Sequence, residues 1–142
     1  MERDYLLAQL RKKSYGESLS GREVIPVYLD DEKKKGYTWF DTDSPVNEAT
    51  ASQCRTALFM VDGQIAYRAD IMEIHSYNEA RLCPAPGKEP KEWKNEKART
   101  WMKLRNLRPE NEITVNRLQI TSSGNALEDV VLRRCLSYVS LR

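Results

Sequence analysis

The chain has 142 residues, the usual length of one domain, and 40% of them are hydrophobic, which is enough for one core. Its 23 basic and 21 acidic side chains give a formal net charge of +2, so overall charge does not by itself indicate a nucleic-acid-binding protein. No apolar run approaches the ~20 residues that span a membrane, and the N-terminus lacks the pattern of a signal peptide.

The first segment has a helical pattern. Within residues 2–14, Tyr5, Leu6 and Leu10 form a narrow apolar stripe surrounded by charges. We expect residues 1–20 to be an N-terminal helix or linker. Such a helix could dock a protein partner or join a fused effector domain.

The next segments predict short strands. Residues 22–30 have strand composition, and Pro26 places that strand at an edge or at a bulge because proline cannot donate a backbone hydrogen bond. A charged turn over 30–36 leads to a strand over 37–40. The polar residues 41–53 then predict a loop.

The clearest element is a β-hairpin that turns at Asp62-Gly63, between "TALFMVD" and "IAYRADIMEIHSY". In its second arm, alternation places Ile71 and Ile74 on opposite faces. A long strand with apolar residues on parts of both faces is typical of a curved sheet or small barrel.

The second half of the chain predicts a loop followed by further strands. Residues 83–96 contain three prolines and a glycine, and they predict a loop. Strands are expected over 98–107 and 112–121, a short helix over 126–134 and a closing strand over 135–141. A single helix over these last two segments is the alternative. Because the turns between strands are short, we expect a mostly antiparallel, barrel-like α+β domain with flanking helices.

The predicted strand 98–107 carries more positive charge than folding requires. Residues 88–108 hold eight basic and three acidic side chains, a net charge of +5. Alternation places Met102 and Leu104 on one face and an aromatic, basic set on the other. Arginine and lysine bind phosphates, and an aromatic ring can stack on a base. The nucleic-acid-binding candidates are Lys97, Arg99, Trp101, Lys103 and Arg105. The alternative is a solvated edge strand protected by its lysines.

Aromatic residues near this strand are candidates for a base pocket. With Trp101, Tyr37, Trp39 and Trp93 can line a cage around a flipped or modified base. The alternative is that these rings cap a small barrel with one polar edge exposed.

The sequence does not indicate a catalytic, metal or cofactor site. His75 is the only histidine, and nucleotide-binding and zinc-protease motifs are absent. Three widely spaced cysteines do not suit a disulfide framework or a zinc site, so we expect reduced thiols, no cofactor and a cytoplasmic protein.

Two stretches resemble a known superfamily. "TALFMVDGQIAYRADIMEI" resembles the central strand pair of PUA-like domains, which include the EVE, YTH and ASCH domains. "KARTWMKLRNLRP", followed by "SSGNALEDVVLRRCLSYVSL", is similar to the back half of EVE-like modules, which are often attached to McrB-type restriction proteins and other antiphage proteins. The resemblance covers roughly residues 22–141. It implies a PUA-like pseudo-barrel domain over 21–142.

The resemblance also implies a function. PUA-like domains bind RNA or DNA, and several read a modified base in an aromatic pocket, for which Trp39, Trp93 and Trp101 are the candidates here. We therefore expect a nucleic-acid-binding module without a membrane segment. It would be the part of a defence or restriction system that directs the system to its nucleic acid. Two alternatives are a protein-interaction domain and an ASCH-like hydrolase of a modified nucleoside, which would need a Lys, a Thr or Ser and a Glu converging in one pocket.

Overall fold

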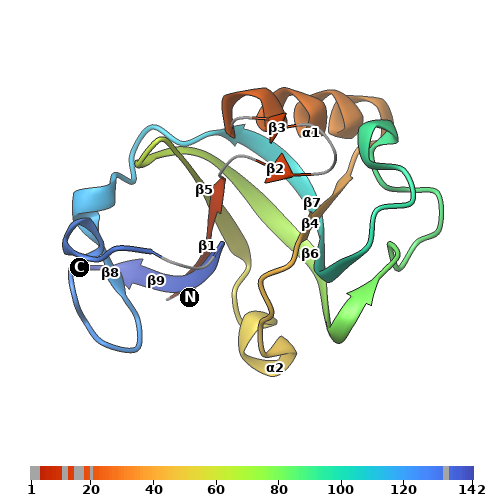
Figure 1. The fold of residues 1–142 in the computed structure, drawn as a ribbon. Helices are drawn as coiled ribbons and strands as arrows, with labels where there is room; N and C mark the ends of the chain where they lie inside the picture. The colour runs from red at the N-terminus through yellow and green to blue at the C-terminus, as the bar shows by residue number, and fades with distance from the viewer. Residues whose placement is uncertain (1–3, 11–12, 15–17, 20, 133–134) are drawn as a thin grey trace.

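The computed structural model describes residues 4–10, 13–14, 18–19, 21–132 and 135–142. A curved seven-stranded sheet in the order β4-β7-β6-β5-β1-β9-β8 dominates it (Figure 1). The strands are β1 (Asp4–Leu10), β4 (Thr38–Thr42), β5 (Thr56–Val61), β6 (Gln64–Arg81), β7 (Ala98–Pro109), β8 (Leu118–Ile120) and β9 (Leu136–Leu141). β2 (Lys13–Ser14) and β3 (Ser18–Leu19) form a separate two-stranded ribbon.

The predicted α+β class is confirmed, but the sheet is mixed and is not closed into a barrel. β1 runs parallel to β5, whereas the other neighbouring strands of the large sheet are antiparallel. Two α-helices are present in the described residues, α1 (Gly21–Lys35) and α2 (Glu48–Ala51). Neither of them is long and apolar enough to span a membrane.

The N-terminal segment is a strand and not the predicted helix. β1 lies between β5 and β9, inside the sheet, and Leu6, Leu7 and Ala8 are all completely buried. A strand covered on both faces has consecutive apolar residues, and over so short a run this pattern resembles a helical stripe. Residues 4–10 are therefore not a linker or a docking helix. The other residues of that prediction include 1–3, 11–12, 15–17 and 20, which lie outside the described residues.

Helix α1 replaces the predicted strand over 22–30 and the predicted turn over 30–36. Val24, Ile25 and Tyr28 are buried on one side of the helix, where they join the main core. Pro26 is exposed near the N-terminal end, where it removes only one helical hydrogen bond. The charged residues continue the helix because Asp31 pairs with Lys35 at 2.8 Å and three lysines lie in the last turn, where the helix dipole favours cations.

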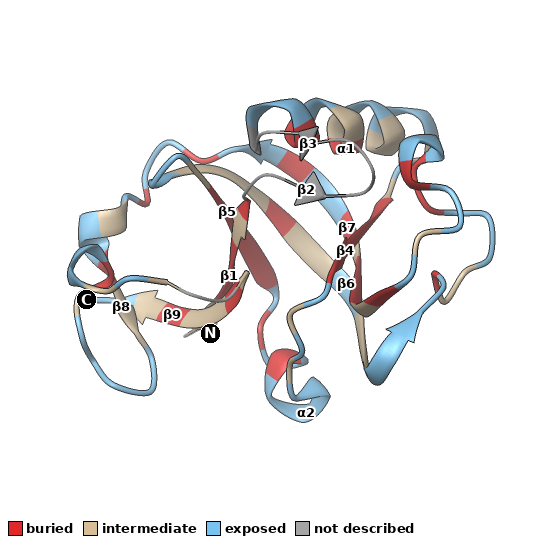
Figure 2. Ribbon diagram, viewed as in Figure 1, coloured by how far each residue is buried: buried red, intermediate tan, exposed pale blue. Residues whose placement is uncertain are grey.

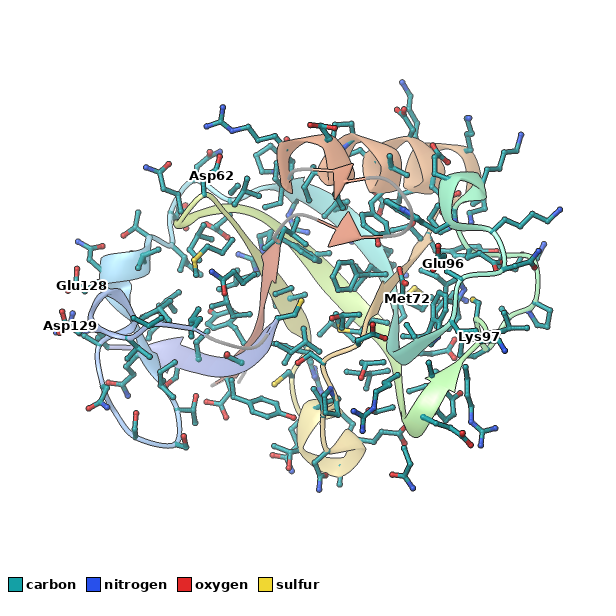
Figure 3. All side chains as sticks on the ribbon, in the orientation of Figure 1. Asp62, Met72, Glu96, Lys97, Glu128 and Asp129 are labelled. Atoms are coloured by element: carbon teal, nitrogen blue, oxygen red, sulfur yellow. The ribbon has the colours of Figure 1, made fainter. Side chains whose placement is uncertain are left out.

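The predicted hairpin is confirmed. β5 and β6 are joined by Asp62 and Gly63, whose φ angles of 51° and 79° fit the left-handed turn that two-residue hairpins use. In β6 the register shifts between Ile71 and Glu73, which makes Met72 a bulge residue, 45% exposed (Figure 3). The bulge corrects the predicted alternation, because Ile71 and Ile74 both pack against the main core.

The segment after β7 contains less regular structure than predicted. Of the strand expected over 112–121, only Leu118–Ile120 is extended, and a 3₁₀ turn at Val115–Arg117 precedes it. The backbone N–H groups of Glu112 and Ile113 donate to the Glu110 carboxylate, which makes the chain turn after Pro109. Residues 133–134 of the expected helix over 126–134 lie outside the described residues, and over 126–132 the chain forms a 3₁₀ turn at Leu127–Asp129 in place of an α-helix. The closing strand is confirmed as β9, and the single-helix alternative is wrong.

Buried residues line both faces of the sheet (Figure 2). The main core lies between α1 and the sheet, and it includes Tyr28, Phe40, Phe59 and Met102. A second cluster lies around Leu7, Leu58 and Leu118. A third, small cluster contains Trp39, Cys83, Ala98 and Trp101, and it bears directly on the predicted site.

Candidate nucleic-acid interface

Strand β7 separates its side chains as the sequence predicts. Met102 and Leu104 belong to the main core beneath α1, whereas Trp101 belongs to the small third cluster. In the sheet register, Trp101 lies between Asp41 of β4 and His75 of β6. Lys103 lies in the same way between Trp39 and Glu73. We call this side of β4, β7 and β6 the outer face.

The tryptophans are buried and do not form a single cage. Trp101, Trp39 and Trp93 are 0%, 2% and 4% exposed, so none of them offers a free ring face to a base in this structure. Trp39 and Trp101 share a cluster with Cys83, and the half-buried Tyr37 packs against it. Trp93 belongs instead to the main core, where its ring lies 4.9 Å from that of Tyr28. The structure therefore brings together three of the four predicted pocket residues and separates the fourth.

Residues 82–97, which we call the covering loop, lie next to the tryptophan cluster. Cys83 anchors one end of this loop in the cluster, and Trp93 anchors it in the main core. Two buried polar atoms here have no hydrogen-bond partner among the described residues: the indole nitrogen Nε1 of Trp39 and the carboxylate oxygen Oε1 of Glu89. By contrast, Nε1 of Trp101 donates to the carbonyl oxygen of Arg81 at 2.9 Å. Trp39 therefore retains a buried donor that a ligand atom could accept from.

Cations surround the aromatic rings at the edge of this cluster. The ammonium of Lys103 lies 4.7 Å from the centre of the Tyr37 ring, and that of Lys35 lies 5.1 Å from it. The guanidinium of Arg81 lies 5.2 Å from the Tyr77 ring. Attraction between a cation and a ring face orients both groups. Tyr37 is therefore the aromatic candidate with both partial exposure and basic neighbours.

Several of the predicted phosphate-binding residues are not neutralised by an acid. Lys103 pairs with Glu73 at 3.7 Å. Among the described residues, no carboxylate oxygen lies within 4 Å of the charged nitrogens of Lys97, Arg99 or Arg105. Lys97 and Arg105 are exposed, and Lys97, which is labelled in Figure 3, directly precedes β7. Alternate residues of a strand point to one face, so Arg99 and Arg105 lie on the same face of β7 as Lys103.

The outer face brings together a histidine, a lysine and a glutamate side chain. His75 is half-buried and lies 3.1 Å from Glu73. Lys103 and Glu73 are paired, but no serine or threonine hydroxyl is hydrogen-bonded to either among the described residues. Among the described residues, no group of three histidine, cysteine or acidic side chains lies close enough together to bind a metal ion.

The sequence prediction missed several members of the outer face. Tyr77 is the last residue of the stretch predicted as a strand, but it is not among the predicted site residues, and Arg81 lies beyond that stretch on the last part of β6. Lys35 belongs to the helix that replaces the predicted turn. The polar residues at 78–81 gave no sign that the strand continues. The contact between Tyr37 and Lys103 joins segments that are far apart in the sequence, so no local pattern indicates it.

The thiol of Cys83 gives a test of how tightly the covering loop is packed. Burial raises the pKa of Cys83 to about 11, although a backbone hydrogen bond at Ala85 acts in the opposite direction. At pH 8 only about one such thiol in a thousand is ionised, against roughly a quarter for an exposed cysteine. We expect iodoacetamide to label Cys83 at least ~100-fold more slowly in the native protein than in urea, as measured by peptide mass spectrometry. Similar rates in the two states would show that the loop is open in solution.

Comparison of the chain with protein-family models, with curated proteins and with solved structures finds no match. The class that the fold defines is therefore an α+β domain with a curved mixed sheet and one long helix across it. Function has to be argued from the outer face itself, because a fold alone does not specify one.

Proposed function

We propose that this chain is a nucleic-acid-binding domain of the PUA-like type, in which β7 holds the phosphate backbone. The observation that carries the proposal is a set of three cations next to aromatic side chains, for which the described residues provide no acidic partner. Arg99 and Arg105 lie on β7, and Lys97 directly precedes that strand. The central position of the β5–β6 hairpin in the sheet supports the PUA-like assignment, since such a hairpin builds those domains.

This set of cations suits a sequence-independent contact. Phosphate contacts from arginine and lysine position a nucleic acid and make binding depend on salt. Lys88, Lys91 and Lys94 on the covering loop are also exposed and extend the basic surface beyond the start of β7. Three phosphate contacts would give a slope of log affinity against log salt of about −2.7 on duplex DNA and about −2.1 on a single strand.

Reading of a modified base is the finer part of the proposal, and it requires the covering loop to move. The buried Trp39 donor and the Tyr37 ring would then become accessible to a flipped base, while Trp101 stays in the core. Within the loop, Gly87 and Asn95 both have positive φ angles, 76° and 65°, so the backbone bends at these two residues. Such a reader would serve as the targeting module of a defence or restriction system.

Removing two cations from β7 tests the backbone contact. We expect the double variant Arg99→Ala/Arg105→Ala to bind about tenfold more weakly and to change the salt slope from about −2.7 to about −0.9, because each lost phosphate contact removes nearly one unit. Affinity is measured by fluorescence anisotropy with labelled duplex DNA, methylated duplex DNA, single-stranded DNA and RNA. Between 50 and 200 mM salt, the unaltered protein should lose about 40-fold in affinity for duplex DNA.

A matched control separates this contact from loss of net charge. Lys33→Ala/Lys34→Ala removes the same charge from the exposed end of α1 and should leave affinity within about twofold. Equal losses in the two double variants would contradict a role for β7. Absence of binding to all four probes at ~100 μM, or about −5.5 kcal/mol, would overturn the proposed function and favour a protein-interaction domain.

A further inference from the structure

A groove of about 570 Å³ lies at the other end of the sheet order from β7. The loop before α2 forms one wall, β9 forms another, and the turn after β8 closes one end. Figure 1 shows α2 below the sheet, on the side where β9 lies. Pockets of about 300–1,000 Å³ suit small organic ligands, so this groove has the volume to hold one.

Hydrogen bonds fix the walls of this groove before any ligand arrives. Asn47 caps α2 by accepting from the backbone N–H of Thr50 at 3.1 Å. The N–H of Val46 donates to the Ser76 hydroxyl at 3.2 Å, and that of Leu136 donates to the Ser44 hydroxyl at 3.3 Å. A wall held in this way needs little ordering on binding, which favours affinity for a small ligand.

The lining combines an apolar floor with a hydroxyl rim. Val46, Cys54 and Leu136 contribute apolar surface. Thr50, Ser122 and Tyr138 carry the hydroxyl groups of this rim. Burial raises the pKa of the Tyr138 phenol, and the nearby Cys54 adds to the effect. The phenol donates to the carbonyl oxygen of Asn47 at 3.4 Å, so its oxygen is left to accept from a ligand. This pattern suits a flat ligand whose edges form hydrogen bonds.

Asp4 places a carboxylate in the lining of the groove. Among the described lining residues there is no lysine, arginine or histidine. The carboxylate would repel a phosphate, whereas an amino group would find an acceptor there.

We propose that this groove is a binding site for an uncharged nitrogen heterocycle that carries an amino group, such as a free nucleobase or nucleoside. The ring would lie on Val46 and Leu136, the hydroxyl rim would bond its edges, and the amino group would donate to Asp4. The same chemistry is presented by a base within a nucleic-acid strand. Since the site is separate from β7, it does not depend on the proposed function.

The test is a titration of the ¹⁵N-labelled full chain with adenosine, followed by amide NMR shifts. We expect saturable shifts at Thr50, Ser137 and Tyr138, with a dissociation constant between about 0.1 and 1 mM. AMP should bind at least about fivefold more weakly than adenosine, because its phosphate brings negative charge near Asp4. A deoxyadenosine decamer shows whether the source is a free nucleoside or a strand. If the ligand is a free nucleoside, the decamer should leave these amide signals unshifted. If the ligand is a base within a strand, the decamer should shift them.

Two variants locate the site. Thr50→Trp fills the groove and should weaken adenosine binding at least about tenfold, whereas Ala49→Trp, on the same short helix but outside the lining, should change it less than about twofold. Purine has the ring of adenine without its amino group. In Asp4→Ala, the ratio of the affinity for adenine to the affinity for purine should fall toward one. Asp4 pairs in the sheet through its backbone, so this change spares the ladder.

Three results would overturn the proposal: no shift at these amides with 5 mM adenosine, tighter binding of AMP than of adenosine, or equal binding by Thr50→Trp and the unaltered protein. Failure here is distinct from failure of the proposed function. The variant Arg99→Ala/Arg105→Ala should bind adenosine as the unaltered protein does, because both arginines lie outside the groove lining.

Discussion

Replacing Trp101 with alanine is expected to lower the free energy of unfolding by about 3–5 kcal/mol, as measured by urea denaturation. The side chain is completely buried between β4, β6 and the covering loop, so its removal leaves a large cavity. The variant also loses the hydrogen bond from Nε1 to the Arg81 carbonyl, and an unpartnered buried carbonyl is costly. Trp101 therefore has a structural role, which corrects its assignment as a stacking platform.

An exposed position on the same face supplies the control. Arg105 lies four residues further along β7, and Arg105→Ala should change stability by less than about 0.5 kcal/mol. A loss below 1 kcal/mol in Trp101→Ala would contradict the buried position and would restore the ring as a binding surface. Because that variant is expected to be unstable, its binding data cannot separate contact from folding, and the charge variants on β7 are the better probes.

Glu110 is expected to stabilise the fold through three hydrogen bonds to one carboxylate. Its carboxylate accepts from Arg68 at 2.9 Å and from the backbone N–H groups of Ile113 and Glu112 at 2.9 and 2.8 Å. Its side chain is 3% exposed, whereas that of Arg68 is 26% exposed, so solvent weakens the ion pair in part. We expect Glu110→Ala to destabilise the protein by about 2–3 kcal/mol at pH 7.

The same residue should make stability depend on pH. Burial by itself raises the pKa of Glu110, but the hydrogen bonds from Ile113, Glu112 and Arg68 outweigh it and the net pKa is lowered. A carboxyl with a lowered folded-state pKa stabilises the fold fully above its ordinary value of about 4.3, and this contribution is lost as the pH falls below that value. The stability difference between the unaltered protein and Glu110→Gln should therefore shrink between pH 5 and pH 3.

Glu112 is a suitable control for this pH dependence, because it is exposed and close in sequence. Glu112→Gln should follow the pH profile of the unaltered protein, in urea unfolding curves measured at several pH values. A Glu110→Gln variant whose stability difference stays constant down to pH 3 would show that the carboxylate is not held in its charged form by these partners.

Local patterns in the sequence were sufficient to predict the hairpin, β7 and β9. The hairpin was recognisable because Asp62-Gly63 fixes both the turn and the register. By contrast, β1 and α1 were assigned to the wrong type. Each segment has only a few apolar residues, which stand next to one another and do not distinguish a helix from a strand. Which of the two forms depends on the segments that pack against it. β1 is covered on both faces, whereas α1 buries only one side.

The candidate interface was only partly predictable for a similar reason. Alternation along β7 correctly separated Met102 from Trp101, because that is a local property of a strand. Whether an aromatic ring is exposed depends on distant segments, and residues 82–97 pack against the tryptophans that the sequence suggested as a pocket. The groove near Asp4 and Tyr138 joins both ends of the chain, so no local motif could indicate it.

The position of β1 has a consequence for the order in which the protein assembles. β1 forms its ladders with β5 and β9, pairing Leu6 with Tyr138 near the far end of the chain. Contacts between such distant residues form slowly, because a long loop must close before they are gained. During synthesis, β1 leaves the ribosome before β5 and β9, and one of its edges stays unpaired until β9 emerges. Until then, its run of apolar residues is exposed to aggregation or to chaperones.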